Sequence, residues 1–313
     1  MLKLNQKKLS YTFDRCQQCG ICYAVCPENA ISLSLRHDGL HDIKINAALC
    51  IACGKCVRSC PANKEYGYEG YFDGFAQKKY YLGYHADNRI RRESSSGGVC
   101  KTLIIDSLKN GMVDGAYSLK CTDSFPFAQG EFYTREHIPS FGDMPNSVYH
   151  SVMACTEIDR IQPCKRLMLV GTACQLRALN SIIKDKCDEV VRVCIFCKQQ
   201  KTLDSTRFLA KMMGTSVPPN LKFRPRYRGD GWPGIVRVDG FELPYSRAAQ
   251  IPFGKRLWTV PGCGICGDSF GMGAGADITL MDPWTICSHN ELGETLVTVH
   301  TQKGDELLNN VFP

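Results

Sequence analysis

The sequence predicts an α/β fold, α+β over the whole chain, with a small cysteine-rich domain followed by a larger domain containing a mostly parallel sheet. Three observations support this. One cysteine motif occurs twice within the first 61 residues. After residue 79, short apolar runs alternate with helical patterns. Some of these runs are continuously apolar, as in strands buried on both faces of a parallel sheet. A chain of 313 residues is long enough for two such domains.

The composition is typical of a globular protein, with 44% hydrophobic and 22% charged residues. No apolar run approaches the roughly 20 residues that a membrane span needs. The first residues carry charge with no apolar stretch behind them, unlike a secretory signal, so we expect a cytoplasmic protein. Nineteen cysteines in a reducing compartment indicate metal binding or redox chemistry.

The duplicated motif has the spacing C-x2-C-x2-C-x3-C-P, at residues 16–27 and again at 50–61. This spacing is typical of bacterial ferredoxins with two [4Fe–4S] clusters, in which the fourth cysteine of each copy ligates the other cluster. Structural zinc is the alternative for CxxC pairs, but zinc sites rarely use triple runs with a trailing Cys-Pro. We therefore assign Cys16, Cys19, Cys22 and Cys60 to one cluster, and Cys50, Cys53, Cys56 and Cys26 to the second.

The remaining elements follow from periodicity. Alternation around Asp38-Gly39 predicts a hairpin of residues 30–35 and 43–45. Strands are expected at 79–84, 113–119, 167–171, 190–196 and 277–281, and helices at 99–109, 176–184 and 202–213. We expect a ferredoxin domain over residues 1–66, a linker over 67–78 and the larger domain over 79–313.

Ligands of such sheets lie at the carboxyl ends of strands. Gly171, Thr172, Cys174 and Gln175 follow one predicted strand and Cys197 follows the next. A run of serines and glycines precedes the 99–109 helix, where it suits a phosphate or serves as an ordinary N-cap. Its candidate ligands are Ser95, Ser96, Gly97 and Gly98. Asp282, at the end of the last predicted strand, is a possible site residue.

Three arginines alternate at Arg224, Arg226 and Arg228. On an extended segment they would share one face and could hold the phosphates or carboxylates of an anionic cofactor. A solvated strand edge that uses charge against aggregation is an equally weighted alternative.

The later cysteines include a CxxC pair, Cys263 and Cys266, which could supply two metal ligands or act as a redox dithiol. With Cys174 and Cys197 the pair would complete four thiolates for a third cubane, and Cys194 competes with Cys197 for that place. We expect the other cysteines to pack in the interior. They are Cys100, Cys121, Cys155, Cys164, Cys187 and Cys287.

The order of motifs resembles the coenzyme F420 hydrogenase/dehydrogenase beta-subunit family of iron–sulfur flavoproteins. The matching segments are 91–99, 147–149, 171–175, 196–197, 223–234, 263–266 and 276–284. The resemblance implies an FAD-binding α/β domain with the Ser-Gly-Gly and Gly-Thr-x-Cys-Gln loops near the flavin. It also implies that the later cysteines lie near an additional cluster. Family members pass electrons between clusters, FAD and a hydride carrier or substrate.

Three positions depart from the family pattern. Ala173 stands where proline is frequent, Val148 where lysine is common, and Met281 where glycine is usual. Val148 puts in doubt a cationic contact to the cofactor or substrate.

The formal charge of +7 does not indicate nucleic-acid binding. Each cluster with its four thiolates contributes about −2, so two clusters bring the total to about +3. A third cluster and a flavin dinucleotide would bring it to about −1. The basic residues can therefore simply balance the cofactors.

Three functions compete. The first is an oxidoreductase that passes electrons between [4Fe–4S] clusters and FAD and on to an F420-like hydride carrier or a small molecule. The second is a non-catalytic relay subunit of a larger redox complex, and the third is a thiol-redox enzyme using Cys263 and Cys266. Expected partners are a ferredoxin, hydrogenase or dehydrogenase subunit, or the hydride carrier. No catalytic residue stands out, and the oligomeric state stays open.

Overall fold

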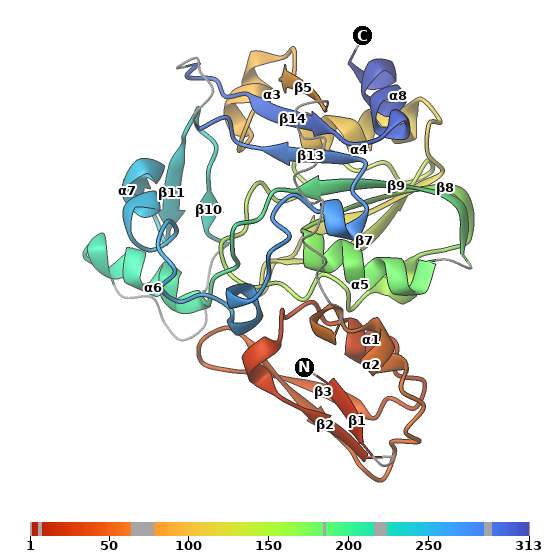
Figure 1. Cartoon of the computed structure of the whole chain (residues 1–313). Helices are drawn as coiled ribbons and strands as arrows, with labels where there is room; N and C mark the ends of the chain where they lie inside the picture. The colour runs from red at the N-terminus through yellow and green to blue at the C-terminus, as the bar shows by residue number, and fades with distance from the viewer. Residues whose placement is uncertain are drawn as a thin grey trace.

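The computed structural model describes residues 2–5, 8–63, 78–183, 186–215, 224–284 and 290–312. Its first region contains two hairpins and two short helices (Figure 1). The hairpins pair β1 (Leu2–Asn5) with β2 (Lys8–Tyr11) and β3 (Ile31–Leu35) with β4 (His41–Ile45). The helices are α1 (Ile21–Ala24) and α2 (Lys55–Ser59). The pairing of β3 with β4 confirms the hairpin predicted around Asp38-Gly39.

A seven-stranded sheet forms the centre of the larger region, in the order β5-β14-β13-β9-β8-β6-β7. The four central strands, β13, β9, β8 and β6, run parallel, and β5, β14 and β7 extend the sheet antiparallel at its two sides. This confirms the predicted α/β fold with a parallel core. The strand bounds are β5 (Lys79–Gly83), β6 (Gly115–Cys121), β7 (Ala128–Thr134), β8 (Cys164–Gly171), β9 (Cys187–Ile195), β13 (Ile278–Met281) and β14 (Thr295–Val299).

Helices cover both faces of this sheet. Helices α4 (Val99–Lys109) and α8 (Gln302–Val311) pack on one face, and α5 (Ala173–Ile183) packs on the other. Successive side chains of β8 point to opposite faces of the sheet. Met168 packs in the core under α4, while Leu167 and Leu169 pack in the core under α5. A strand buried on both faces explains the continuous apolar run in the sequence.

A third group of elements flanks the sheet and has its own core, which includes Leu209, Val236, Tyr245 and Phe253. It contains helix α6 (Leu203–Met212), the three-stranded sheet β10 (Arg226–Tyr227), β11 (Ile235–Val238) and β12 (Phe241–Pro244), and helix α7 (Tyr245–Gln250). Helix α3 (Asn88–Glu93) lies beside β5 (Figure 1).

The cysteine-rich region packs below α5, on the same side of the sheet (Figure 1). Backbone hydrogen bonds join it to the larger region. The Cys155 N–H donates to the Cys19 carbonyl at 2.8 Å, and the Gly262 N–H donates to the Cys16 carbonyl at 3.0 Å. A third bond, from Leu203 N–H to the Asp38 carbonyl at 2.7 Å, anchors the β3–β4 turn.

Two details differ from expectation. Helix α5 begins at Ala173, so Cys174 and Gln175 lie in its first turn and not in a loop. The reason is local, because the Gln175 side chain accepts a hydrogen bond from the Thr172 N–H at 2.9 Å and stabilises that turn. The expected linker 67–78 lies outside the described residues apart from Lys78. Within the described ranges, no helix is long and apolar enough to cross a membrane.

Candidate functional site

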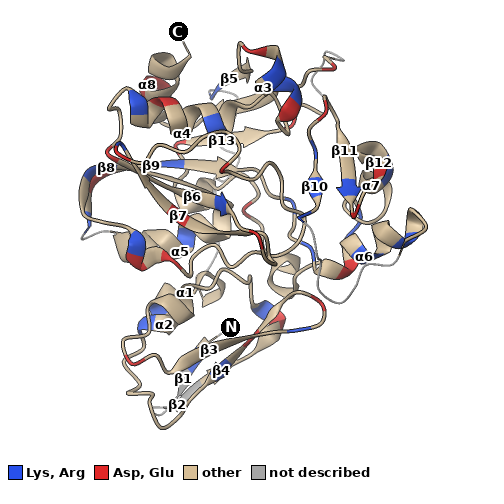
Figure 2. Ribbon diagram, turned by 180° about the vertical axis from the view of Figure 1, so that it is seen from behind, with Lys and Arg blue, Asp and Glu red and all other residues tan. Residues whose placement is uncertain are grey.

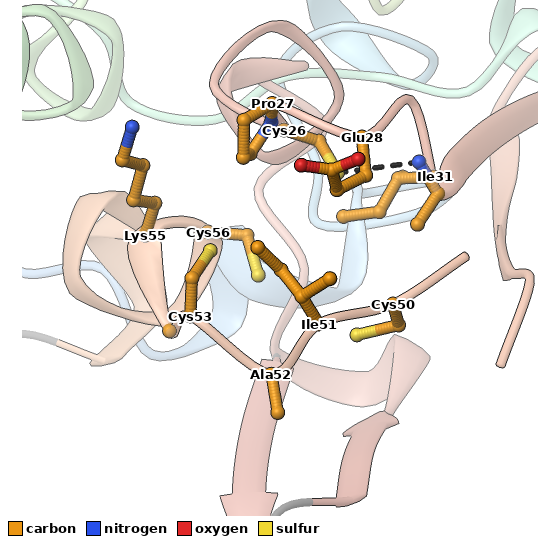
Figure 3. A pocket seen from close by; sticks show the side chains of 12 residues that line it. Cys26, Pro27, Glu28, Ile31, Cys50, Ile51, Ala52, Cys53, Lys55 and Cys56 are labelled. Atoms are coloured by element: carbon orange, nitrogen blue, oxygen red, sulfur yellow. Dashed lines mark hydrogen bonds between the residues drawn. The ribbon is translucent and has the colours of Figure 1, made fainter. Parts of the chain in front are cut away.

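Four cysteines of the first region line a small cavity together with Pro27, Ile31, Ile51 and Lys55 (Figure 3). They are Cys26, Cys50, Cys53 and Cys56, the set that the motif assigns to the second cluster. Left-handed backbone at Ala52 and Gly54 turns the loop around this cavity. The Ala30 N–H donates to Cys26 Sγ at 3.3 Å, a bond that suits a thiolate. Burial, with smaller contributions from the other three thiols, raises the pKa of Cys56 to about 11.

Cys16, Cys19 and Cys22 are buried at the start of α1, and Cys60 follows α2. Burial raises the pKa of Cys22 well above its ordinary value, and the thiols of Cys19, Cys16 and Cys60 add to the effect. The structure therefore brings this set together as well. Gln18 holds the loop in place, since its N–H donates to Cys16 Sγ at 3.4 Å and its side-chain oxygen accepts from the His41 N–H at 2.8 Å.

A third set of thiols comes from three separate segments. Cys174 lies at the start of α5, Cys197 follows β9, and Cys263 and Cys266 belong to the loop after residue 260. Burial raises the pKa of Cys174, and the Cys263 and Cys197 thiols raise it further. Burial raises the pKa of Cys197 to about 12, with Cys263 and Cys266 contributing. Cys197 and Cys263 thus influence Cys174, and Cys263 and Cys266 influence Cys197.

Polar groups contact the sulfurs of this set. Thr172 Oγ1 lies 3.3 Å from Cys174 Sγ, and the Gln200 N–H donates to Cys263 Sγ at 3.4 Å. Cys194 is placed differently from Cys197. Its side chain is fully buried in β9 on the α5 side of the sheet, in the same apolar core as Ala274 and Ala276.

The raised thiol pKa values have a chemical meaning. Without a metal these thiols stay protonated at neutral pH, so iron binding must displace their protons. Over the ranges that the structure describes, no three His, Cys, Asp or Glu side chains converge tightly enough to hold a single ion. A cubane does not need such convergence, because each of its four irons takes one thiolate.

The three sets follow one another through the molecule. Cys56 of the second set raises the pKa of Cys22 in the first, and Cys19 of the first raises the pKa of Cys174 in the third, although neighbours within each set and burial contribute more. The second set is the outermost, since Cys53 is exposed and Ile51 beside it is 62% exposed. The arrangement can therefore carry electrons stepwise from the surface toward α5.

Arg228 does not share a face with Arg224 and Arg226, contrary to the expectation for these three arginines. Its backbone is left-handed, with φ of 70°, and its side chain is 1% exposed. The guanidinium donates two hydrogen bonds to Asp282, at 2.8 and 2.9 Å, and a third to the Ser95 carbonyl at 2.9 Å. Burial alone would raise the pKa of Asp282, but Arg228 outweighs it and holds that pKa below its ordinary value.

The serine hydroxyls expected to bind phosphate have protein partners. Ser96 Oγ donates toward Asp282 Oδ1 at 2.7 Å and the Glu294 carbonyl at 2.6 Å, and Ser95 Oγ accepts from Ser147 at 2.9 Å. Gly97 and Gly98 adopt left-handed backbone, which lets the loop pass against β14. Gln175 is likewise committed to the Thr172 N–H, with Gly171 packed against its side chain. These residues position the loops, and Ser94 is the member of the run that lines the adjacent groove.

That groove, of about 730 Å³, lies between α3, the 141–148 loop and β10–β11. Five basic and two acidic side chains line it, namely Arg89, Lys101, Arg224, Arg226, Arg237, Asp87 and Glu93. The Lys101 ammonium donates at 2.8 Å to three neutral oxygens, of Phe141, Met144 and Asn146. Burial lowers the pKa of Lys101 to about 8. The groove therefore suits an anionic ligand.

His150 faces this groove in a defined tautomer. Its Nε2 lies 2.7 Å from the Pro126 carbonyl, so Nε2 carries the proton, and Nδ1 accepts from the Tyr227 hydroxyl at 3.2 Å. Burial lowers the pKa of His150 to about 4, which keeps the ring neutral at pH 7. Lys101 could not be assigned from the sequence, because it is a single polar residue within a helix. His150 follows the matching segment 147–149, but nothing else in the sequence singles it out.

Two models of the coenzyme F420 hydrogenase/dehydrogenase beta subunit match the chain, the N-terminal model over residues 80–136 and the C-terminal model over residues 164–312. The chain belongs to this family. Two 4Fe-4S dicluster domain models also match this chain, one over residues 15–64 and the other over residues 42–96. It is therefore an iron–sulfur protein of the beta-subunit family with a dicluster domain at its N-terminal side.

Relatives cover different parts of this family member. MJ1349 of Methanocaldococcus jannaschii is 22% identical over 309 residues, which cover 86% of this chain and 80% of that protein. NADH-quinone oxidoreductase subunit I 2 of Geobacter metallireducens is 32% identical over 65 residues. That match covers 19% of this chain and half of the relative. A chain of the F420-reducing [NiFe] hydrogenase complex of Methanosarcina barkeri shares the fold, with a TM-score of 0.52 and 18% identity over 74% of this chain and 77% of that one.

Proposed function

We propose that this protein is an iron–sulfur flavoprotein oxidoreductase. It passes electrons between [4Fe–4S] clusters and FAD, and on to an F420-like hydride carrier or a small-molecule substrate. The observation that carries the proposal is the sequence of three thiol sets that leads from the exposed Cys53 to Cys174 beneath the sheet. Family membership supports the same chemistry.

The residues present fit three clusters. Each set offers four cysteine sulfurs, and backbone N–H groups donate to Cys16, Cys26 and Cys263. Such bonds stabilise thiolates, which the buried thiols of all three sets need. The third set would comprise Cys174, Cys197, Cys263 and Cys266. A dithiol role for Cys263 and Cys266 suits their position less well, because burial raises the pKa of Cys263 to about 11 and disfavours the nucleophilic thiolate.

The groove fits a dinucleotide flavin by size and charge. FAD, when bound, couples a two-electron hydride transfer to the single-electron chemistry of clusters. Lys101 and Arg224 would neutralise its pyrophosphate, together with Arg226, which also pairs with Glu93. Neutral His150, whose ring nitrogens bond Pro126 and Tyr227, would form part of the groove wall without adding charge. Arg228 would act indirectly, since it fixes Asp282 and the Ser95 carbonyl beside the groove.

One observation favours the relay alternative. Val148 lines the groove at the position where the family pattern has lysine. A groove without that cation would bind an anionic hydride carrier less tightly, and the chain would then serve only to conduct electrons within a larger complex.

Electrons would enter or leave at the second cluster. Ile51 lines the cavity with Cys53 and Lys55, and both Ile51 and Leu49, close to it in the chain, are exposed apolar residues. An exposed apolar rim beside a cluster is a suitable contact for a redox partner protein.

The deciding experiment is anaerobic purification with iron and flavin analysis on one sample. We expect about twelve irons and one FAD per chain. The Cys197→Ser variant should retain about eight irons, and Cys194→Ser should retain all twelve. About eight irons and no flavin in the wild type would overturn the proposal.

The same sample distinguishes enzyme from relay. Reduced F420, NADH and NADPH are added to the anaerobic holoprotein, and bleaching of the flavin absorbance is recorded. Bleaching by one of these donors supports the oxidoreductase. Flavin that only dithionite reduces supports the relay subunit.

A further inference from the structure

Cys164 and Cys187 form a pair of thiols that belongs to none of the three sets. They lie directly opposite each other at the starts of the parallel strands β8 and β9. Their sulfur atoms are 3.3 Å apart, and both side chains are half-buried. The same two strands carry Cys174 and Cys197 beyond their other ends. The pair therefore lies at the amino-terminal ends of these two strands, whereas the proposed third cluster lies beyond their carboxyl ends.

The backbone geometry suits a disulfide. Neighbouring strands lie about 4.8 Å apart, which falls within the range of about 4.4 to 6.8 Å that Cα atoms span across a disulfide. At 3.3 Å the sulfurs are in contact but not bonded. A change of side-chain torsion angles would bring them to bonding distance while the strand register of Cys164 with Cys187 stays as it is.

We propose that Cys164 and Cys187 are a reversible disulfide site that responds to small-molecule disulfides. One of the two thiolates attacks one sulfur of the oxidant, forms a mixed disulfide and expels the first small thiol. The other thiolate then attacks the protein sulfur of the mixed disulfide and expels the second small thiol. Two protein thiols are thereby oxidised by two electrons, one small-molecule disulfide is reduced to two thiols, and the two protein protons go to the thiolates released.

Burial and the contact with Cys187 raise the pKa of Cys164, and the carboxylates of Asp114 and Asp188 add to the effect. The second attack needs no diffusion, because the two sulfurs already lie within contact distance.

The bond would close residues 164–187 into a loop and join the two central strands at their starts. Such a cross-link restricts the unfolded chain and stabilises the region. Because the pair is remote from the thiol sets, its oxidation should leave the clusters intact. This inference does not depend on a flavin or on a third cluster.

The test treats the anaerobic holoprotein with glutathione disulfide, blocks remaining thiols by alkylation and maps the peptides by mass spectrometry. The expected result is one Cys164–Cys187 cross-linked peptide, two fewer alkylated thiols and unchanged iron content. Reduction by dithiothreitol should restore both thiols. Cys121→Ser is the matched control, since it removes another half-buried thiol outside the three sets and should leave the cross-link unchanged.

Two further variants keep the proposal falsifiable. Cys164→Ser and Cys187→Ser should each abolish the cross-linked peptide and leave a lasting glutathione adduct on the remaining thiol. Free alkylation of both thiols in the treated wild type would overturn the proposal. So would pairing of either cysteine with a third one while the iron content stays constant.

Discussion

Arg228 shows how one buried charge organises the groove-side loops. Its guanidinium joins Asp282 at the end of β13 to the serine loop before α4, and it stacks over the Tyr245 ring at 4.3 Å. Trp232 adds a hydrogen bond to the same carboxylate at 3.3 Å. Removing one partner of such a pair leaves the other charge buried without compensation, which costs far more than losing a surface pair.

Asp282→Asn should therefore destabilise the protein clearly. We expect a loss of about 3 kcal/mol, seen as a fall of about 1 M in the urea midpoint of anaerobic unfolding followed by tryptophan fluorescence. Glu189→Gln removes the partner of Arg166 in a pair whose side chains are 47% and 38% exposed, and it should shift the midpoint little. Equal shifts in the two variants would contradict the account of Arg228.

The buried His150 should make the stability of the folded protein sensitive to acid. Burial lowers its folded pKa to about 4 from an ordinary value near 6.5, so the unfolded chain takes up the proton first as the pH falls. The stability due to neutral His150 is complete above about pH 6.5 and decreases until about pH 4, by about 3 kcal/mol. Between pH 7 and 4.5 the urea midpoint of the wild type should fall further than that of His150→Gln.

The exposed His137 supplies the control for this measurement. His137→Gln should keep the full pH dependence of the wild type. A wild-type profile that parallels His150→Gln over this range would show that His150 does not titrate as the buried ring requires.

At the scale of elements, the 261–264 turn joins the cysteine-rich region to the third thiol set. Its Gly262 N–H donates to the Cys16 carbonyl. A Cβ added at Gly262 would lie 2.5 Å from the Arg15 carbonyl oxygen, whereas one at Gly264 would meet nothing within 4 Å. Of these two glycines of one turn, Gly262 is thus closely approached by the loop that carries Cys16, and Gly264 is not.

Gly262→Ala should push this loop away from Cys263 and slow electron transfer between the clusters of the dicluster domain and the flavin. Stopped-flow absorbance of the anaerobic holoprotein measures the rate. Gly264→Ala should transfer electrons like the wild type, and both variants should keep their full iron content. An unchanged rate in Gly262→Ala would show that this contact does not set the distance between the clusters.

The sequence was sufficient for elements with a strong local signal. The α4 bounds, the β3–β4 hairpin and the parallel strands β8 and β9 follow from periodicity within each segment. The antiparallel outer strands could not be placed, because β5 meets β14 through contacts between residues more than 200 positions apart. The direction of Arg228 was missed for a similar reason, since a left-handed φ at a non-glycine residue has no sequence signal.

On the scale of the whole molecule, the thiol sets form a path from one surface to the interior. Basic and acidic positions, blue and red on the ribbon of Figure 2, intermingle along the chain. Eight of the twelve cysteines follow a spacing rule, whereas the grouping of the other four rests on a CxxC pair and two strand ends and stays a prediction. The groove around Lys101 could not be predicted, since its walls come from segments scattered between residues 87 and 237.

Cys53→Ser should interrupt this path at its outer end. The variant should lose about four irons and transfer electrons to a ferredoxin acceptor far more slowly than the wild type. Reduction of its flavin by the effective hydride donor should persist, because no residue of the second set lines the groove. Loss of both activities would indicate that the second cluster is needed for folding, which circular dichroism of the same sample would reveal.

The position of β13 and β14 in the sheet has a consequence for biosynthesis. Strand β5 pairs with β14, and β13 lies between β14 and β9, so a strand made early completes the sheet only with strands made some 200 residues later. On the ribosome the cysteine-rich region can close on its own hairpins and helices long before this. The nascent chain would thus expose the β5 and β9 edges until translation is nearly finished, which makes this interval the natural point for chaperone engagement.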